Sequence, residues 1–258
     1  MKISTIIAAL MGLINSHRIE YDYRQKPSFN RVVRISVVVP CYYKHASLLI
    51  DLIRAYEAQT RLPYEMIIAL SQADKVDQAV LESIQQGSFK FPVKLLCSDQ
   101  QATAGENRNR ACSAAQGTII VCQDADDLPH PQRLEIIGYF FKTYPIDHLM
   151  HQFAQENIMD HVYDPKQISY KTLRDFEKIW ECGLVTNGNV AFARHVFEQV
   201  QWSKRILGED VVFNSSVYDL FHHNVVLEVP LIAYRAQFSS HHTKKQMSEG
   251  MIDSSYCA

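Results

Sequence analysis

This sequence has little of several features that would place it in a known class at once. Its N-terminal apolar run, Ile6 to Ile14, has nine residues, far fewer than the ~20 of a membrane-spanning helix. Neither charge is in excess, because 26 Lys and Arg stand against 28 Asp and Glu. Without surplus cations the chain cannot neutralise many phosphates, so nucleic acid is not an expected partner. Only 9 Gly and 9 Pro among 258 residues exclude collagen-like and Pro-rich repeats.

Close cysteine pairs and glycine-rich loops are also missing. The six cysteines form no C-x-x-C pair, so neither a zinc site nor a thioredoxin-like motif is expected. Widely spaced cysteines are typical of a reducing compartment, and we expect a cytoplasmic protein, either free or peripheral to a membrane. No G-x-x-x-x-G-K-S/T, G-x-G-x-x-G or G-x-S-x-G motif occurs. P-loop NTPases, Rossmann dehydrogenases and α/β hydrolases are therefore excluded.

The first 33 residues differ from the rest of the chain. The apolar side chains that would share one face of a helix are Ile3, Ile6, Leu10, Leu13 and Ile14. Such a helix fits docking on the domain or on a membrane surface, and the same run fits the apolar core of a signal peptide. We favour the docked helix, followed by a polar linker from residue 21 to 34, and leave the other two open. Membrane association is not required.

The remaining chain, residues 34–258, carries the pattern of one α/β domain. Apolar runs typical of buried strands lie at 35–40, 66–70, 93–97 and 118–122, and helical patterns lie between them at 48–56, 80–84 and 104–115. Strands that alternate with helices over short connections form parallel sheets. A helix beyond Leu134, a strand at 148–153, a helix at 211–221 and a strand at 225–229 that ends at Pro230 should follow, while residues 155–182 show no clear period.

Ligands of such sheets bind at the carboxyl ends of the strands, and an acidic cluster stands there. Asp124, Asp126 and Asp127 directly follow the apolar run 118–122. Carboxylates so close together repel one another, and a divalent cation that prefers oxygen ligands would remove that cost. The alternative is a solvated turn that caps the following helix, where Asp is common. From the residues alone the two interpretations are nearly balanced.

Three other segments carry groups that could take part in chemistry. Glu209 and Asp210 precede a helical stretch, where they are either ordinary first-turn acids or a base for a hydroxyl proton. Arg108 and Arg110 could pair with phosphate, although a surface helix with a Glu106–Arg110 pair is equally consistent with the pattern. His241 could complete a cation site if the tail folds back.

Taken together, these segments resemble the family 2 glycosyltransferases, which have the GT-A fold. The matching segments run in family order, and the one around 105–135 is specific, while later ones are short. They are 35–40, 65–68, 105–110, 116–127, 187–189, 208–210 and 234–235. The resemblance covers about residues 34 to 240. It implies a mostly parallel α/β sheet flanked by helices in a single domain, and inverting transfer of a sugar from a nucleotide-sugar, most simply a UDP-sugar, to an acceptor hydroxyl.

The resemblance also implies roles for individual residues. Asp124 and Asp126 match the D-x-D carboxylates that hold the donor's ribose and a Mn²⁺ or Mg²⁺ ion on its diphosphate. Arg108 and Asn109 match the pair that lines the donor site. Asp127 stands beside the D-x-D carboxylates as a further metal ligand.

Further roles fall on the first strand, the Glu-Asp pair and the tail. Pro40 and Tyr42, at the end of the first strand, would also contact the donor. Glu209 and Asp210 match the family's catalytic acidic pair, with Asp210 as the general base. His241 would be the third protein ligand of the metal.

Two departures from the family pattern stand out. An acidic pair usually follows the second strand and contacts the nucleobase, whereas this chain has Leu70 and Ser71 there. A histidine usually follows the Tyr-Arg closely, whereas here Gln237 is nearest and His241 comes later. The leading hypothesis is a metal-dependent glycosyltransferase acting on a glycan or another hydroxyl acceptor. The alternatives are a catalytically inactive GT-A-like binding module and a nucleotidyltransferase.

Overall fold

The apolar runs of the N-terminal half form neighbouring strands of one sheet. The computed structural model describes residues 31–155, 157–172 and 188–235. Its strands are β1 (Ile35–Tyr42), β2 (Glu65–Ser71), β3 (Val93–Ser98), β4 (Ile119–Cys122), β5 (Leu128–Pro129), β6 (His148–Ala154), β7 (Tyr170–Thr172), β8 (Val190–Ala193) and β9 (Asn224–Ala233). Its helices are η2 (Tyr43–Leu48), α2 (Leu49–Glu57), η3 (Ala73–Lys75), α3 (Gln78–Gln85), α4 (Ala104–Ala114), α5 (Arg133–Thr143), α7 (Arg194–Gln199) and α8 (Glu209–Leu220).

The strand order is β3-β2-β1-β4-β8-β6-β9-β5, with β7 paired to β9. The first four strands in this order are parallel, as the alternation of strands and helices predicts. Strand β8 then pairs antiparallel with both β4 and β6, and β6 is parallel to β9. The side chains that follow β1 and β4 therefore emerge at one edge of the sheet, next to the mixed half.

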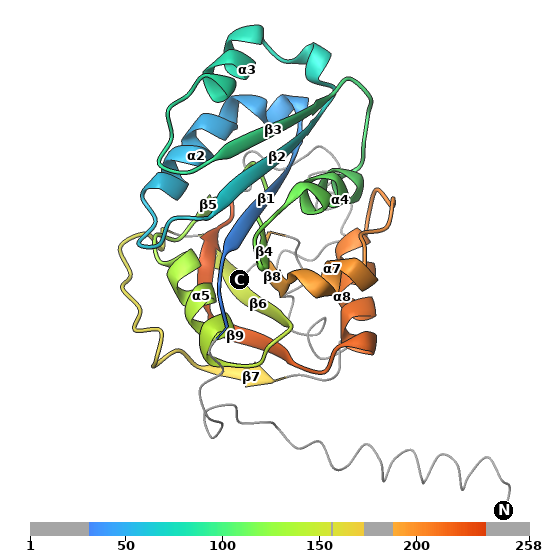
Figure 1. Cartoon of the computed structure of the whole chain (residues 1–258). Coiled ribbons are helices and arrows are strands. Elements are labelled where there is room, and N and C mark those ends of the chain that lie inside the picture. The colour runs from blue at the N-terminus through green and yellow to red at the C-terminus, as the bar shows by residue number, and fades with distance from the viewer. Residues whose placement is uncertain (1–30, 156, 173–187, 236–258) are drawn as a thin grey trace, which may run out of the picture.

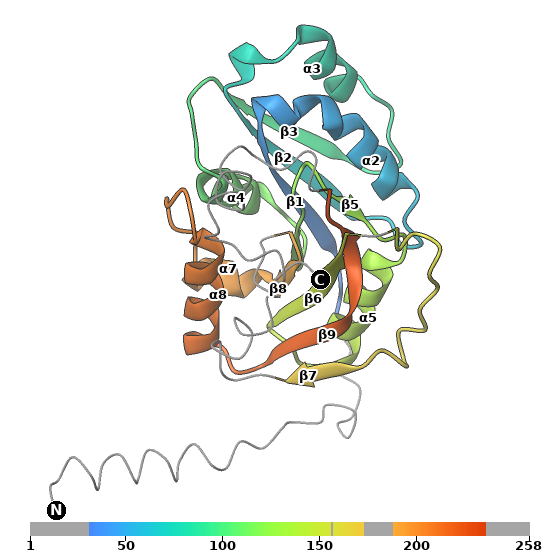
Figure 2. The same ribbon diagram turned by 180° about the vertical axis from the view of Figure 1, so that it is seen from behind.

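Both faces of the parallel half are covered by helices, which is why its strands are apolar without alternation. Val37 and Val39 belong to a core shared with α2, α3 and α5, whereas Val38 belongs to a second core shared with α4, α7 and α8. Figures 1 and 2 show α2 and α3 on one face and α4, α7 and α8 on the other. The α/β class with a helix-flanked sheet is thus confirmed.

Three features differ from the prediction or were not foreseen. Strand β9 does not end at Pro230 but runs through it to residue 233. The register of β6 against β9 shifts beside Pro230, and this bulge accommodates a residue that lacks an N–H. We did not predict strands β7 and β8 or helix α7, because none of them shows a clear hydrophobic period in the sequence. The proposed helix over the first residues lies outside the described residues, so the division of the chain at residue 34 stays a prediction.

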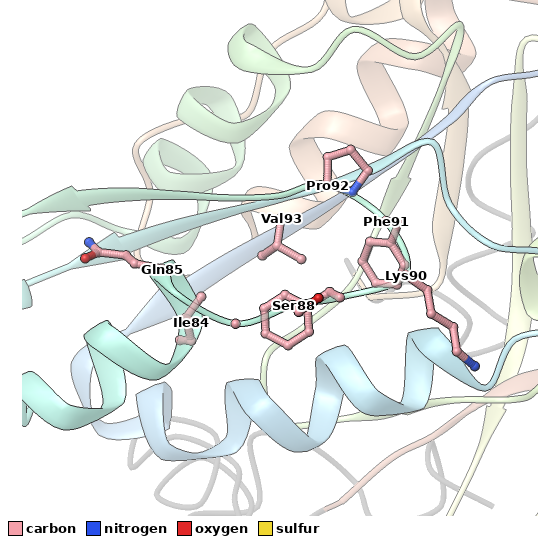
Figure 3. Close-up of a pocket in the computed structure, with 9 residues that line it drawn as sticks. Ile84, Gln85, Ser88, Lys90, Phe91, Pro92 and Val93 are labelled. Atoms are coloured by element: carbon pink, nitrogen blue, oxygen red, sulfur yellow. The ribbon is translucent and has the colours of Figure 1, made fainter.

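Two further findings concern the protein away from the site. Within the described ranges, no helix is both long and apolar enough to cross a membrane. A pocket of about 420 Å³ lies between the end of α3 and the start of β3 and is lined by residues 84, 85 and 87–93 (Figure 3). It opens at the amino end of β3, whereas ligands of such sheets bind at the carboxyl ends.

Candidate active site

The acidic segment leaves β4 at the carboxyl edge of the sheet. We call residues 123–127 the acidic turn. Its first amide, that of Gln123, still donates to the carbonyl of Val38 on β1, at 3.0 Å. The turn is closed by the amide of Asp127, which donates to the carbonyl of Asp124 at 3.4 Å. Its backbone therefore projects three carboxylates just beyond the parallel strands.

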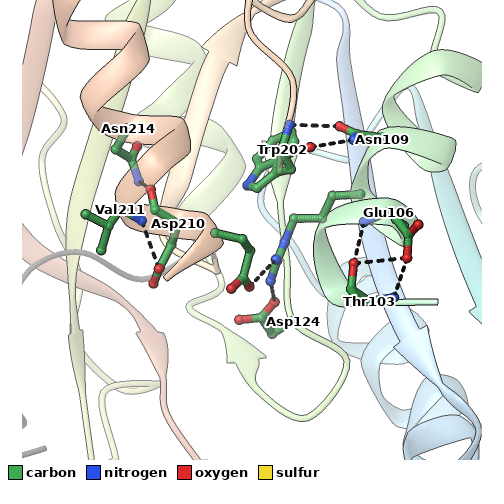
Figure 4. A network of polar contacts seen from close by, with 10 residues as sticks. Thr103, Glu106, Asn109, Asp124, Trp202, Asp210, Val211 and Asn214 are labelled. Atoms are coloured by element: carbon green, nitrogen blue, oxygen red, sulfur yellow. Dashed lines mark hydrogen bonds and ion pairs between the residues drawn. The ribbon is translucent and has the colours of Figure 1, made fainter. Parts of the chain in front are cut away.

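Arg108 joins the acidic turn to helix α8. Its Nη2 donates to Asp124 Oδ1 at 2.7 Å and its Nη1 to Glu209 Oε1 at 3.1 Å, two of the bonds drawn in Figure 4. Only 4% of the guanidinium side chain is exposed, and its Nε is buried without a hydrogen-bond partner. Burial would lower the pKa of Arg108, but Asp124 and Glu209 outweigh it and raise the pKa above its usual value.

Helix α4 holds Arg108 in place through its own first turn. Thr103 caps the helix, and its side chain and that of Glu106 satisfy each other's backbone amides in a capping box. Gly105 lies so close to the segment before α8 that a Cβ there would meet the carbonyl of Ser203 at 2.3 Å. Glu106 is thus a capping residue, and the alternative Glu106–Arg110 surface pair is wrong: Arg110 instead donates to Asn107.

Asn109 has a structural partner rather than an open side chain. Its Nδ2 donates to the carbonyl of Trp202 at 2.9 Å, and its Oδ1 accepts from the amide of Trp202 at 3.0 Å (Figure 4). Both halves of the amide are therefore used to fix the segment before α8. The role of Asn109 at the donor site stays a prediction, and its bonds to Trp202 could not be seen from the sequence, because a single-sequence pattern does not show which polar side chains have partners.

Asp126 lies between the Asp124 carboxylate and the ring of His45. Burial and the neighbouring Asp124 carboxylate raise its pKa, while His45 opposes the rise. His45 Nδ1 lies 3.9 Å from Asp126 Oδ2. Histidine 45 was not predicted, and its only sequence signal is its place three residues beyond the end of β1. Its ring also meets the ring of Tyr42 edge-on, with centroids 5.7 Å apart.

Asp127 turns toward the protein. Its Oδ1 accepts from the amide of Arg235 at 3.0 Å, and Arg235 Nε donates to the carbonyl of Asp126 at 2.6 Å. Burial, Asp124 and Asp126 together raise the pKa of Asp127 well above its ordinary value. The chain segment after β9 is thereby attached to the acidic turn.

Glu209 and Asp210 begin helix α8. The preceding Gly208 has φ 72°, a left-handed conformation that favours glycine, and turns the chain into the helix. Glu209 is engaged by Arg108, whereas Asp210 Oδ1 accepts from the amide of its neighbour Val211 at 2.9 Å (Figure 4). Burial and the adjacent Glu209 raise the pKa of Asp210 to about 6. A carboxylate with such a pKa is a suitable proton acceptor near neutral pH.

The ends of β1 and β2 form another wall of this edge. Pro40 is buried and paired with Ala69, and Tyr42 ends the strand. Ser71 takes the place of the expected carboxylate, and it accepts from Asn107 Nδ2 at 3.1 Å. Asn107, 2% exposed, was not singled out from the sequence.

The metal ligands named from the sequence do not form a complete protein cluster. In residues 31–155, 157–172 and 188–235, no three His, Cys, Asp or Glu side chains stand as ligands of one ion. His241 lies outside the described residues. Carboxylate oxygens are nevertheless the donors that Mn²⁺ and Mg²⁺ prefer, so Asp126 and Asp124 fit such an ion if a diphosphate supplies the remaining ligands.

The family of the chain follows from comparison with known sequences. It belongs to glycosyl transferase family 2, whose sequence model matches residues 36–201. No curated protein matches the chain significantly.

Solved structures share its fold at low sequence identity. A TarS fragment from S. aureus, crystallised with UDP-GlcNAc, has a TM-score of 0.67 at 16% identity, over 81% of this chain and 60% of that one. Glucosyl-3-phosphoglycerate synthase from Mycobacterium tuberculosis was crystallised with Mn²⁺, UDP and glucosyl-3-phosphoglycerate. Its TM-score is 0.61 at 18% identity, over 93% of this chain and 86% of that one. Mannosyltransferase PcManGT from Pyrobaculum calidifontis, in complex with GDP-Man and Mn²⁺, has a TM-score of 0.57 at 16% identity, over 88% of this chain and 64% of that one. These likenesses show the GT-A fold.

Proposed function

We propose that this protein transfers a sugar from a nucleotide-diphosphate-sugar to an acceptor hydroxyl, with inversion and with a divalent cation. The observation that carries the proposal is the bridge of Arg108 between Asp124 and Glu209. It brings the acidic turn and the first turn of α8, distant in sequence, to one place at the carboxyl edge of the sheet. A donor-binding carboxylate, Asp124, and the residue next to the candidate base, Glu209, then lie on either side of one buried cation.

The proposed reaction is a single displacement in which Asp210 acts as the base. Asp210 takes the proton of the acceptor hydroxyl, and the acceptor oxygen forms a bond to the anomeric carbon. The bond from that carbon to the diphosphate oxygen breaks, and the nucleoside diphosphate leaves on the opposite face. Attack opposite to the leaving group inverts the configuration. Arg108 holds Glu209, and thereby the start of α8, at a fixed distance from the acidic turn.

The donor would lie along the ends of β1 and β4. Asp124 and Asp126 would hold its ribose and a Mn²⁺ or Mg²⁺ ion, and such an ion, when bound, offsets the charge of the departing diphosphate. The support from this structure is the donor set itself, carboxylate oxygens at a place where burial and then the neighbouring Asp124 carboxylate raise the pKa of Asp126. The relatives crystallised with Mn²⁺ and with UDP or GDP-Man support both parts of the proposal.

Titration calorimetry of UDP and GDP, each with and without Mn²⁺, tests donor binding. We expect metal-dependent binding of one nucleotide, with UDP the first choice. Asp126→Ala should weaken that binding at least tenfold, because it removes the carboxylate that compensates the ion. Equal affinity of wild type and variant would contradict the assignment of Asp126. Turnover of the matching nucleotide-sugar then tests transfer, which Asp210→Asn should abolish.

A catalytically inactive GT-A-like binding module is the second candidate. The observation in its favour is at the end of β2, where Leu70 and Ser71 are buried and Ser71 is bonded to Asn107. The carboxyl end of β2 therefore offers no carboxylate to a nucleobase. If neither UDP nor GDP binds with Mn²⁺, this candidate replaces the first, and a donor turned over in a metal-dependent way excludes it.

We further propose a glycan or another hydroxyl compound as the acceptor and the cytoplasm as the location. The support for the location is that Cys41, Cys112 and Cys122 are buried free thiols, which persist in reducing compartments. Fractionation of cells that produce the protein, with and without high salt in the wash, separates a free protein from one held at a membrane surface.

A further inference from the structure

Arg133 is the largest fully buried side chain of the described residues, and it begins helix α5. All of its N–H directions are used. Its acceptors are Tyr56 Oη at 2.8 Å, Gln123 Oε1 at 2.9 Å, His151 Nε2 at 3.1 Å, the carbonyl of Cys122 at 2.8 Å and the carbonyl of Gly188 at 2.7 Å.

None of these five partners is a carboxylate, and no ion pair involves Arg133 in the part of the chain that the structure describes. A buried charge without an opposite partner is costly, because the protein interior stabilises the charged form less than water does. The stability of the fold alone therefore gives little reason for an arginine here. The groups that Arg133 contacts give a better reason.

The contacts of Arg133 converge on the acidic turn. It binds the last carbonyl of β4 and the side-chain oxygen of Gln123. The amide group of Gln123 in turn donates to the carbonyls of Asp124, at 2.8 Å, and Asp127, at 3.2 Å. Tyr56 also donates to Gln123 Oε1, at 2.9 Å. Arg133 and Tyr56 thus fix the orientation of the Gln123 side chain. Its amide group in turn holds both ends of the acidic turn.

The carbonyl of Gly188 extends this network to the opposite wall. A Cβ added at Gly188 would lie 3.0 Å from Asp124 Oδ2, so this backbone directly faces the carboxylate. Because Arg133 donates to the Gly188 carbonyl, it holds both the chain that carries Asp124 and the chain against which Asp124 rests.

We propose that Arg133 is a positioning residue, which acts through Gln123 and Gly188 to hold the acidic turn in the geometry that binds the donor. The proposal rests on the function proposed above, in which Asp124 and Asp126 bind the donor and its cation. Lysine could not take its place, since an ammonium has three donors on one atom, whereas the planar guanidinium reaches five acceptors in several directions.

The chain offers a matched control. Arg194 is likewise the first residue of a helix, α7, and donates to backbone carbonyls at the other end of β4, those of Gly117, at 2.8 Å, and Ala115. Arg133→Lys and Arg194→Lys are the same change at opposite ends of one strand, and we expect both to lower Tm.

The experiment compares the two variants by calorimetry with Mn²⁺-UDP and by hydrogen exchange of peptides that contain residues 123–127. We expect Arg133→Lys to bind at least tenfold more weakly and to exchange faster in the acidic turn. Arg194→Lys should bind within twofold of wild type and keep the turn protected. Wild-type exchange in the turn of Arg133→Lys, or an equal change in both variants, would overturn the proposal.

Two further provisions keep the outcome clear. If Arg133→Lys does not fold, Tyr56→Phe removes only the hydroxyl that fixes Gln123, and it should weaken binding by about threefold and speed exchange in the turn. Wild-type exchange in that variant would then overturn the proposal. If wild type binds neither UDP nor GDP, the proposed function fails, and hydrogen exchange alone still decides whether Arg133 positions the turn.

Discussion

Arg108 shows how much one buried side chain contributes at the scale of a residue. It pairs with Asp124 and Glu209 at once, so each carboxylate helps to keep the other near the cation. Its neighbour Asn109 has a different task, since both of its polar atoms bind the backbone of Trp202. Of these two adjacent residues, Arg108 therefore belongs to the site, and Asn109 belongs to the packing that supports it.

Asp210 gives a prediction in which activity and stability change in opposite directions. Its pKa of about 6 lies above the ordinary value for Asp, so the native state binds the proton more tightly than the unfolded state does. Ionisation of Asp210 therefore destabilises the native state, fully above pH 6 and not at all below about pH 4. Asp210→Asn should abolish transfer and raise the free energy of unfolding at pH 8 by roughly 1–2 kcal/mol.

Urea unfolding at pH 8 and pH 4 measures that stability, and the gain should vanish at the lower pH. The matching kinetic measurement is kcat/KM of the wild type, which should fall as the pH drops through about 6, because the base becomes protonated. A variant that is destabilised at both pH values, or a flat pH profile down to pH 5, would contradict the assignment of Asp210 as the base.

At the scale of elements, the site depends on how α4 meets the segment before α8. Gly105 makes that approach possible because a Cβ would meet the Ser203 carbonyl at 2.3 Å and the Cβ of Trp202 at 3.1 Å. The helix carries Arg108 one turn later. Any outward shift of α4 would thus lengthen the bridge from Arg108 to Glu209.

We expect Gly105→Ala to lower both stability and activity. The added methyl forces α4 away from a backbone carbonyl, and overpacking of this kind costs about 1–3 kcal/mol. Thermal unfolding and initial rates with the nucleotide-sugar check the prediction. Gly208→Ala is the control. No atom lies within 4 Å of its Cβ position, so only the left-handed φ should lower the free energy of unfolding, by on the order of 1 kcal/mol. Equal activity of Gly105→Ala and wild type would contradict the role given to this contact.

Other elements show which parts of the fold the sequence could predict. Strands β1 to β4 and the helices between them are long, strongly apolar or clearly periodic, and each was predicted within a few residues. Strand β5 has two residues, which is too short for a period to be visible, and β8 was not predicted although it has four residues, as many as β4. Pro230 misled for a related reason, because the bulge that tolerates it depends on β6, a neighbour distant in sequence.

At the scale of the whole molecule, the parallel half and the mixed half of the sheet meet at the candidate site. The acidic turn comes from β4, the last strand of the parallel half, and the segment around Arg235 comes from β9 in the mixed half. A donor bound there would contact both halves. Its binding should therefore stabilise the entire domain rather than one loop.

Thermal unfolding with ligand tests this expectation. Saturating UDP with Mn²⁺, near 100 times its Kd, should add about 2.7 kcal/mol of stability and raise Tm by several degrees. Removal of the metal with EDTA should cancel the rise, and Asp126→Ala should show none. A rise in Tm that persists in EDTA would show that the nucleotide binds without a cation and would contradict the proposed metal dependence.

The sequence alone determined the class of fold and indicated the acidic residues of the candidate site. Buried parallel strands must be apolar on both faces, and this local requirement makes them visible in one chain. The carboxylates of 124–127 were visible as polar groups directly after an apolar run, and Glu209 and Asp210 as acids directly before a helical stretch. Only the tertiary structure decided which of these groups have partners within the protein. Arg108, Asn109 and Arg133 are all polar residues on helices, and their different tasks follow from atoms that come near only when distant segments pack.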